Sequence, residues 1–269
     1  MKKIKWILII ITIALVSYVL LYWLQEVWAH RNIGNAMEYQ QIELSENFEY
    51  ETFFLQTGLG KTAINKLIEK NEFDTILNIQ EKFWEKPDVV CKSIFGLYSK
   101  VDKVDRNKTP ELVDLQPGDI LITLSTHSAG WHHGHAGLVL DENYVLECVK
   151  WGEESEIVKV SHWRTYSNYV VMRVKNASSE EAEMVAKYAK ENLCGVPYRL
   201  SVGVLSGKLL NRKNKMFGTH CGHCVWYAWK MFGYDLDSDG GRIVTPYDVM
   251  MSKEVEIVQV YGMNPKIFM

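Results

Sequence analysis

Cys221 and His135 have the residue types and the positions expected of a cysteine nucleophile and its base. Cys221 follows the loop-like segment 218–220 and opens an apolar run, residues 221–229, typical of a buried helix. His135 opens the strand-like run 134–140. A helix N-terminus and a neighbouring imidazole each favour the thiolate, which is the nucleophilic form of cysteine. The pair therefore predicts covalent catalysis at a carbonyl group.

Glu147 is the predicted third member of this site. It is the charged residue in the otherwise apolar start of the strand-like segment 144–149, and the turn residues 141–143 join that segment to the strand of His135. In such a hairpin Val149 lies opposite His135, so Glu147 is a diagonal neighbour of the histidine. A buried carboxylate needs a partner. We therefore expect Glu147 to orient the ring of His135.

The order of these motifs resembles a known family. The segments that carry the likeness are 115–121, 134–140, 145–147, 195–198 and 221–226, within about residues 112–262. They look like the circularly permuted branch of the NlpC-type papain-like cysteine hydrolases, which includes the YiiX-like bacterial proteins and, distantly, lecithin retinol acyltransferase. The resemblance implies a permuted papain-like fold, with Cys221 as nucleophile, His135 as base and Glu147 as the third polar residue.

Two positions depart from that pattern. Members of the family often carry Ser directly after the nucleophile and an aliphatic residue three positions after it, whereas this chain has Gly222 and Cys224. Cys224 is either a small buried hydrophobic residue or a second thiol. The tetrapeptide 221–224 also occurs in protein disulfide isomerases, so a thiol–disulfide oxidoreductase is an alternative. However, the thioredoxin-like site of those enzymes follows an apolar strand, and no apolar strand precedes Cys221. The residues from Cys224 to residue 269 are also too few for the strands and helices that follow such a site.

Histidines are concentrated just before the predicted catalytic strand. His127, His132, His133 and His135, together with cysteines, could form a zinc site. A metallohydrolase would need further His or acidic ligands just beyond His135, and residues 136–139 supply none. We predict no catalytic metal and no cofactor, and we place His132 and His133 in a loop beside the site. Packing or surface roles are expected for the remaining candidates, His162, His220 and His223.

The N-terminus predicts a membrane anchor. Residues 6–24 carry no charge, and a bilayer-spanning helix needs about 20 mainly apolar residues. The lysines in residues 1–5 favour a cytoplasmic N-terminus with the rest of the chain outside. Because no small-residue cleavage site follows Leu24, an uncleaved anchor is preferred over a signal peptide. We therefore expect a single-pass protein of the cell membrane with an extracytoplasmic catalytic domain.

Changes in composition divide the rest of the chain. After the basic tip 1–5 and the anchor 6–24, we expect a tether over 25–50, a helical segment over 51–110 and the catalytic domain over 111–269. Helices are predicted over 61–70 and 73–84, strands over 120–124, 136–140, 144–149, 156–160, 169–174 and 255–261, and helix starts near 178, 221 and 245. Hairpin strands packed on a few helices indicate an α+β fold with an antiparallel sheet. Asp119 is expected to cap the turn at 116–119.

Composition limits the partners. The net charge of −3 provides no strong basic field, so no nucleic-acid partner is expected. The five cysteines are odd in number and irregular in spacing, unlike a disulfide framework. Two substrate classes fit a membrane-anchored hydrolase that resembles this family, namely cell-wall peptide and acyl lipid. A non-catalytic anchored interaction domain remains a further alternative.

Overall fold

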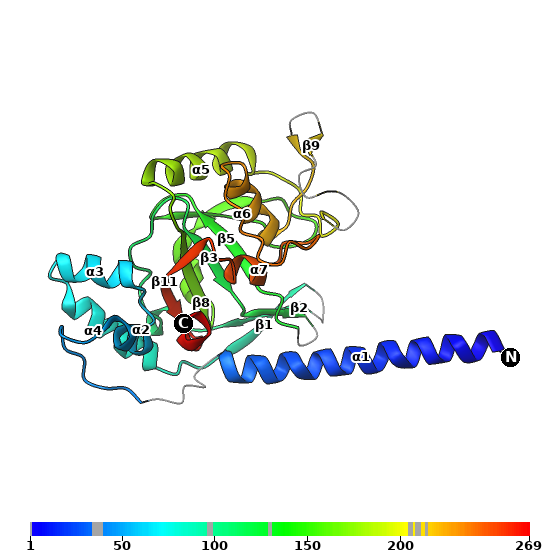
Figure 1. Cartoon of the computed structure of the whole chain (residues 1–269), viewed down its shortest axis with the longest axis horizontal. Helices are drawn as coiled ribbons and strands as arrows, with labels where there is room; N and C mark the ends of the chain where they lie inside the picture. The colour runs from blue at the N-terminus through cyan, green and yellow to red at the C-terminus, as the bar shows by residue number, and fades with distance from the viewer. Residues whose placement is uncertain are drawn as a thin grey trace.

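The protein has a mixed α+β architecture with a long apolar helix at its N-terminus. The computed structural model describes residues 2–33, 40–95, 99–128, 131–203, 207, 211–212 and 215–269. Helices pack on both faces of an antiparallel sheet, and the N-terminal helix extends away from this domain (Figure 1). The predicted α+β class with an antiparallel sheet is confirmed.

The central sheet has six strands in the order β11-β8-β3-β5-β6-β7, and all neighbouring strands are antiparallel. Its members are β3 (Ile120–Thr123), β5 (His135–Val139), β6 (Tyr144–Glu147), β7 (Glu156–Lys159), β8 (Tyr169–Val174) and β11 (Val255–Tyr261). Each coincides with a predicted strand to within two residues. Every residue of β3 and β5 is buried, because both faces of the sheet are covered.

Alternating side chains of the sheet contribute to two hydrophobic cores. On one face, Ile120 and Leu138 pack in a cluster with residues of α5 (Ser179–Asn192), α6 (Cys221–Lys230) and α7 (Pro246–Met250). On the other face, Leu121 and Val139 pack in a cluster with residues of α2 (Tyr50–Thr57), α3 (Lys61–Glu69) and α4 (Phe73–Trp84). His135 and Glu147 therefore lie on a sheet that is packed tightly on both sides, and Cys221 begins a helix that packs on one of them.

The segment 51–110 is helical only in its first part. Beyond Trp84, β1 (Val90–Phe95) and β2 (Ser99–Lys103) form a hairpin, and β4 (Thr126–Ser128) joins it in a three-stranded sheet of order β1-β2-β4. Pro87 cannot extend a helix, and the β-branched and aromatic residues after it favour a strand. The pairing with β4 is remote in sequence, so the prediction of a wholly helical segment was wrong here.

Short elements complete the chain. They are the 3₁₀ helices η1 (Arg106–Lys108), η2 (Val160–Thr165) and η3 (Pro265–Phe268), and the two-residue strands β9 (Asn211–Arg212) and β10 (Lys215–Met216). Of these, η2 matters most for the site, because it follows β7 and carries two aromatic residues that contact Glu147.

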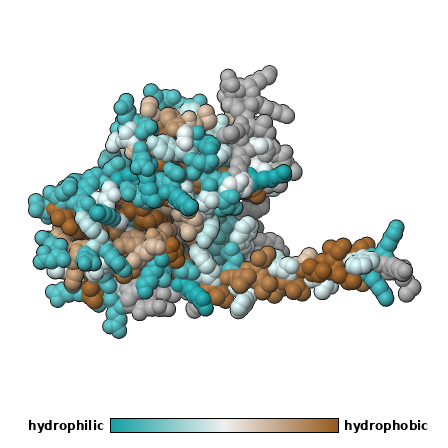
Figure 2. Space-filling view, viewed as in Figure 1, coloured by the Kyte–Doolittle hydropathy of each residue, from teal (hydrophilic) through white to brown (hydrophobic). Residues whose placement is uncertain are grey.

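The N-terminal helix α1 (Lys2–Asn32) includes a stretch, Lys3–Ala29, that is long and apolar enough to cross a membrane and contains an 18-residue window with a mean hydropathy of 2.6. Such a helix is typical of a membrane anchor or of a signal sequence. Figure 2 shows it as an apolar rod that leaves the domain. Residues 25–32, predicted as the start of a polar tether, continue this helix, because the sequence has no Gly or Pro between Leu24 and residue 32.

The end of α1 contacts the domain. The ring of Trp28 lies edge-on to Tyr247 of α7, with the ring centroids 6.0 Å apart. The backbone N–H of Asn264 donates to the carbonyl oxygen of Asn32 at 2.9 Å. Ala29 is buried. The apolar helix therefore ends against the face of the domain that includes α7.

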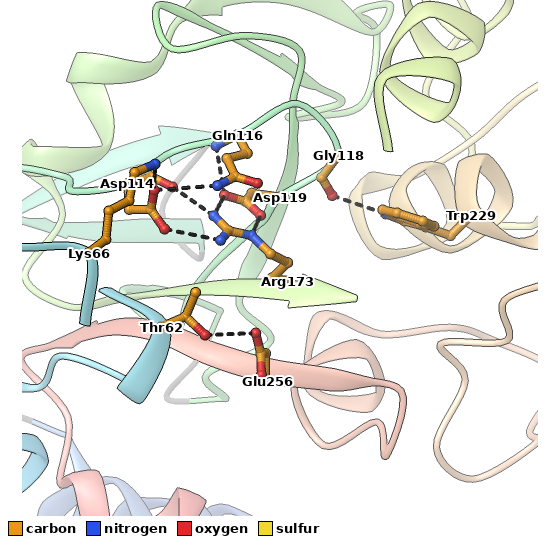
Figure 3. A network of polar contacts seen from close by, with 9 residues as sticks. All are labelled: Thr62, Lys66, Asp114, Gln116, Gly118, Asp119, Arg173, Trp229 and Glu256. Atoms are coloured by element: carbon orange, nitrogen blue, oxygen red, sulfur yellow. Dashed lines mark hydrogen bonds and ion pairs between the residues drawn. The ribbon is translucent and has the colours of Figure 1, made fainter. Parts of the chain in front are cut away.

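A buried polar network joins α3, β8 and the turn before β3 (Figure 3). Arg173 of β8 donates from Nε and Nη2 to the two carboxylate oxygens of Asp119, each at 2.8 Å, and from Nη1 to Asp114 at 3.0 Å. Lys66 of α3 pairs with Asp114. Asp119 also accepts from the backbone N–H of Gln116 at 2.8 Å, which confirms the predicted turn cap.

This network also positions the helix that carries Cys221. The carbonyl oxygen of Gly118, next to Asp119, accepts a hydrogen bond from the indole Nε1 of Trp229 at 3.1 Å (Figure 3). Gly118 has a φ of 84°, and a Cβ there would lie 2.9 Å from the Trp229 ring. The turn at 116–119 thus fixes the C-terminal part of α6 against β3.

We expect Arg173→Ala to lower the free energy of unfolding by about 3–5 kcal/mol, because it leaves two buried carboxylates without their main partner. The side chains of Asp114 and Asp119 are only 3% and 1% exposed. Urea unfolding of the purified chain measures the change. Arg242→Ala is the matched control: Arg242 is exposed, and its loss should cost less than about 0.5 kcal/mol. Equal effects of the two variants would contradict a stabilising network.

Candidate active site

Cys221 is the first residue of α6, as predicted. The backbone before it is extended, and His220 is the N-cap, whose Nδ1 accepts the N–H of His223 at 3.4 Å. Cys221 is partly exposed, whereas the rest of the first turn, residues 222–224, is buried. The thiol therefore lies at the positive end of a buried helix and remains accessible from outside.

Gly222, one of the two departures from the family pattern, has a steric cause. A Cβ at this position would lie 2.3 Å from the carbonyl oxygen of Val244 and 2.8 Å from the carbonyl carbon of Thr245. The backbone that leads into α7 thus packs directly on the helix start. Only glycine permits this approach, so the Ser that family members often carry does not fit here.

His135 begins β5, and Glu147 ends the neighbouring strand β6. The register pairs Gly137 with Glu147, which makes Glu147 the diagonal neighbour of His135, as the hairpin turn predicts. His135 Nε2 lies 3.3 Å from Glu147 Oε2, and both side chains are almost fully buried. α6 packs against β5. The structure thus brings Cys221, His135 and Glu147 together.

Two residues of η2 complete the surroundings of Glu147. His162 Nε2 donates to Glu147 Oε1 at 2.7 Å, and the indole Nε1 of Trp163 donates to the same oxygen. The Trp163 ring also stacks on His135, with centroids 5.6 Å apart and planes inclined by 16°. Trp163 therefore fixes both the orientation of the His135 ring and the position of the Glu147 carboxylate.

Gly137 makes room for this arrangement. It lies two residues after His135, on the same face of β5. A Cβ there would lie 3.0 Å from Trp163 Cζ2 and 2.7 Å from Val145 Cγ2. The glycine of the His-Ala-Gly sequence thus has a physical explanation, because a side chain would push Trp163 away from the histidine.

The electrostatics of the site favour the charged forms of Glu147 and His135. Burial by itself would raise the pKa of Glu147, but hydrogen bonds and charge attraction from His135 and His162 prevail and lower its pKa to about 2. Burial likewise acts to lower the pKa of His135, whereas its interactions with Cys221 and with the Glu147 carboxylate raise that pKa to about 10. A buried imidazolium beside a buried carboxylate is the result.

Cys221 responds to the same charges. Burial acts to raise the pKa of its thiol, but the hydrogen bonds and positive charge of His135, followed by those of His220, bring the pKa well below its ordinary value. The residues therefore favour a thiolate–imidazolium pair at neutral pH.

His220 and His162 contact the site, although the sequence suggested only packing or surface roles for both. His220 directly precedes Cys221, and its Nδ1 accepts a hydrogen bond, so Nε2 carries the proton in the neutral ring. That Nε2 is buried and has no partner of ordinary hydrogen-bond geometry among the residues that the structure describes, although the ring lies near enough to Cys221 to lower the pKa of its thiol. The adjacency of His220 to the nucleophile was visible in the sequence, whereas the approach of η2 was not.

Cys224 is a buried core residue. It is 2% exposed and belongs to the hydrophobic cluster between α6 and the sheet. Burial and the nearby charge of Cys221 raise the pKa of Cys224 to about 12. All five cysteines are free thiols in the structure. These properties favour the interpretation of Cys224 as a small hydrophobic residue in the place of an aliphatic one.

A cavity of about 380 Å³ lies between the site and the end of the N-terminal apolar helix. Gln25 and Trp28 of α1 line one side, and Trp131, His132 and His133 are among the residues on the other. Burial lowers the pKa of His133, on which Cys221 and His135 also act, so this wall adjoins the catalytic candidates. His132 and His133 therefore lie beside the site, as predicted.

A second cavity of about 640 Å³ approaches Cys221 from another direction. Its lining includes Trp151, Tyr198, Arg199 and Leu200. Burial raises the pKa of Tyr198, and the charge of Cys221 adds to this effect. The backbone of Tyr198 also bridges to Thr219, two residues before the nucleophile. Trp151 and Leu200 are exposed. This cavity offers an apolar surface next to a cationic side chain.

Comparisons with known proteins assign neither a family nor an activity to this chain. No family model matches the sequence, and no curated protein matches it. Among solved structures, the chain is similar to the metalloprotein YiiX from Escherichia coli O157:H7, with a TM-score of 0.39 and 18% sequence identity. The superposition covers 53% of this chain and 96% of that chain. So distant a likeness establishes neither a fold family nor an activity for this chain.

Proposed function

We propose that this protein is a membrane-anchored cysteine hydrolase whose catalytic domain faces away from the cytoplasm. The observation that carries the proposal is the thiol of Cys221 at the start of a buried helix, paired with a buried His135 that Glu147 and Trp163 hold in place. The resemblance of the ordered motifs to permuted papain-like hydrolases agrees with this geometry.

The mechanism uses the thiolate–imidazolium pair. The Cys221 sulfur attacks the carbonyl carbon of an amide or ester and forms a tetrahedral oxyanion. His135 then gives its proton to the leaving nitrogen or oxygen as the bond to carbon breaks, which leaves a thioester on Cys221. His135, now neutral, takes a proton from a water molecule that attacks the thioester and releases the acid. Glu147 stabilises the imidazolium throughout.

Backbone N–H groups of the first turn of α6 would stabilise the oxyanion, because they point out of the helix N-terminus beside the sulfur. The Nε2–H of His220, which has no partner of ordinary hydrogen-bond geometry among the described residues, is a second donor beside the sulfur. A buried donor left unpaired costs about 1–3 kcal/mol, unless a ligand or an intermediate pairs with it. We infer that His220 adds to the oxyanion site.

The substrate that the surroundings favour is an acyl lipid. The cavity lined by Gln25 and Trp28 opens where α1 meets the domain, so a membrane anchor would place it at the bilayer surface. The exposed Trp131 on its rim suits the membrane interface. Cell-wall peptide remains the second candidate, on the basis of the NlpC-type motifs and the predicted export.

Labelling with a thiol-reactive acyl probe tests the catalytic proposal. Labelling of the full-length protein should be lost in Cys221→Ser, strongly reduced in His135→Asn and retained in Cys224→Ser. The last variant is the matched control, since Cys224 lies on the same turn but is buried. Loss in Cys224→Ser with retention in Cys221→Ser would make Cys224 the nucleophile. Absence of labelling in the wild type would favour a non-catalytic interaction domain.

Thiol–disulfide exchange using Cys221 and Cys224 is the remaining alternative. Redox Cys-x-x-Cys motifs occur beside βαβ units, which contain parallel strands, whereas the six-stranded sheet here is antiparallel throughout. Insulin-reductase activity that requires both cysteines would support this alternative against hydrolysis.

The two substrate classes are separated by product analysis. Phospholipid vesicles should release free fatty acid with the wild type and not with Cys221→Ala, which has lost only the nucleophile. Release of stem peptides from purified cell wall, with intact lipids, would identify the peptide class instead. The same protein preparation serves both assays, so inactivity in one is interpretable from the other.

A further inference from the structure

A second group of chemically active side chains lies on the three-stranded sheet. Cys91 comes from β1, Asp102 from β2 and His127 from β4. The register places Cys91 directly opposite Asp102, and the backbone N–H of Asp102 bonds to Ser125, two residues before His127. The three side chains therefore project from one face of the sheet, although they are far apart in the sequence.

Their ligand atoms have the spacing of a coordination site. His127 Nε2 lies 3.3 Å from Asp102 Oδ1 and 3.9 Å from Cys91 Sγ, and all three ligand atoms lie within 4.8 Å of one another. For tetrahedral zinc with ordinary bond lengths, neighbouring ligand atoms are about 3.4–3.6 Å apart. Small movements of the side chains would therefore bring all three to bonding distance.

We propose that Cys91, Asp102 and His127 bind a zinc ion, with the fourth coordination position left to water. The combination of thiolate, imidazole and carboxylate suits Zn²⁺, whereas Ca²⁺ and Mg²⁺ prefer oxygen ligands alone. This site is separate from Cys221 and His135, and the proposal does not depend on the hydrolase mechanism.

The thiol of Cys91 would bind the cation as the thiolate, because a coordinating thiol is deprotonated by the metal. A lone hydrogen-bonded thiol would not need an imidazole and a carboxylate together.

The position of the site gives it a structural role near the active site. His127 lies in β4, and residues 131–134 then lead to His135 at the start of β5. The neighbouring His132 ring, 5.0 Å from that of His127, donates from Nδ1 to the carbonyl oxygen of Leu124 at 2.8 Å. A metal that joins β1, β2 and β4 would therefore fix the position of β4. Residues 131–133, which follow β4, line the cavity beside the active site.

Cobalt binding tests the proposal without any measurement of activity. The full-length protein in detergent is stripped with a chelator and titrated with Co²⁺, which gives a thiolate-to-metal absorption band when cysteine is a ligand. One equivalent should bind with this band, and Zn²⁺ should displace it. Cys91→Ser should abolish the band, and Asp102→Asn and His127→Ala should each weaken Co²⁺ binding at least about 100-fold, since even outer partners of a metal site contribute about 10- to 100-fold.

Matched cysteine variants identify the site. Cys194→Ser removes another exposed cysteine and should leave the titration unchanged, as should Cys221→Ser. Circular dichroism of each variant shows whether the fold is retained, and the conservative Asp102→Asn serves if His127→Ala unfolds. Absence of a stoichiometric band in the wild type, or a band that survives Cys91→Ser and is lost in Cys221→Ser, would overturn the proposal.

Discussion

The alkylation rate of Cys221 should stay nearly constant between about pH 5 and pH 9 in the wild type and should rise about tenfold per pH unit, up to about pH 8.5, in His135→Asn. The wild type keeps its thiolate because His135 and, after it, His220 hold the Cys221 pKa well below its ordinary value. Removing the His135 imidazole takes away the stronger of the two interactions that oppose desolvation of the sulfur. Its pKa should then return to at least about 8.5.

The direction of each pKa shift determines the pH at which the alkylation and hydrolysis rates should change. A lowered thiol pKa means that the thiolate is lost only when the pH falls below that value. The alkylation rate should therefore drop at a lower pH than it does for an ordinary thiol. A pKa of His135 raised to about 10 means that the imidazolium survives until the pH exceeds about 10. Hydrolysis needs both groups, because His135 must still donate a proton to the leaving group. Its rate should therefore decline near pH 10.

Mass spectrometry of the peptide that contains Cys221 measures the reaction with iodoacetamide, and glutathione in the same tube gives the profile of an ordinary thiol. His135→Asn should also lower the hydrolysis rate by about 10²- to 10⁴-fold, as expected for loss of a general acid–base group. A wild-type profile parallel to that of glutathione would show that no ion pair forms. Such a result would remove the basis for the proposed mechanism.

The three central residues of the site could be predicted because each depends on local rules. A thiol at the start of an apolar run, a histidine at the start of a strand and a short turn suffice to place Cys221, His135 and Glu147. The turn length fixes the register of β5 and β6, and the register fixes which carboxylate faces the histidine. The central strands followed in the same way from their apolar patterns.

The remaining parts of the site depend on contacts between distant segments. Trp163 reaches His135 only because η2 folds over β5 and β6, and no periodicity in the sequence indicates this. The steric need for Gly222 arises from the backbone at Val244. The β1–β2 hairpin likewise requires β4, which lies beyond β3 in the chain. Pairing across such separations is set by tertiary packing, which overrides local propensity.

His220 is the residue whose role the sequence least suggested. We expect His220→Ser to lower kcat by about 10²- to 10³-fold, which is the usual effect of removing one oxyanion donor, with little change in KM. Serine is a good N-cap, so the helix start should be retained while the ring and its Nε2–H are lost. Hydrolysis of the acyl substrate across a concentration series separates kcat from KM.

The pH profile of alkylation distinguishes an oxyanion role from a purely electrostatic one. His135 acts more strongly on the Cys221 pKa than His220 does, so His220→Ser should keep a nearly flat alkylation profile while losing turnover. A donor that serves the oxyanion affects acyl transfer, whereas alkylation by iodoacetamide forms no oxyanion. If alkylation and hydrolysis fell together, His220 would act through the thiolate. If neither fell, its buried Nε2 would have no part in the chemistry, and the backbone N–H groups of α6 would stabilise the oxyanion alone.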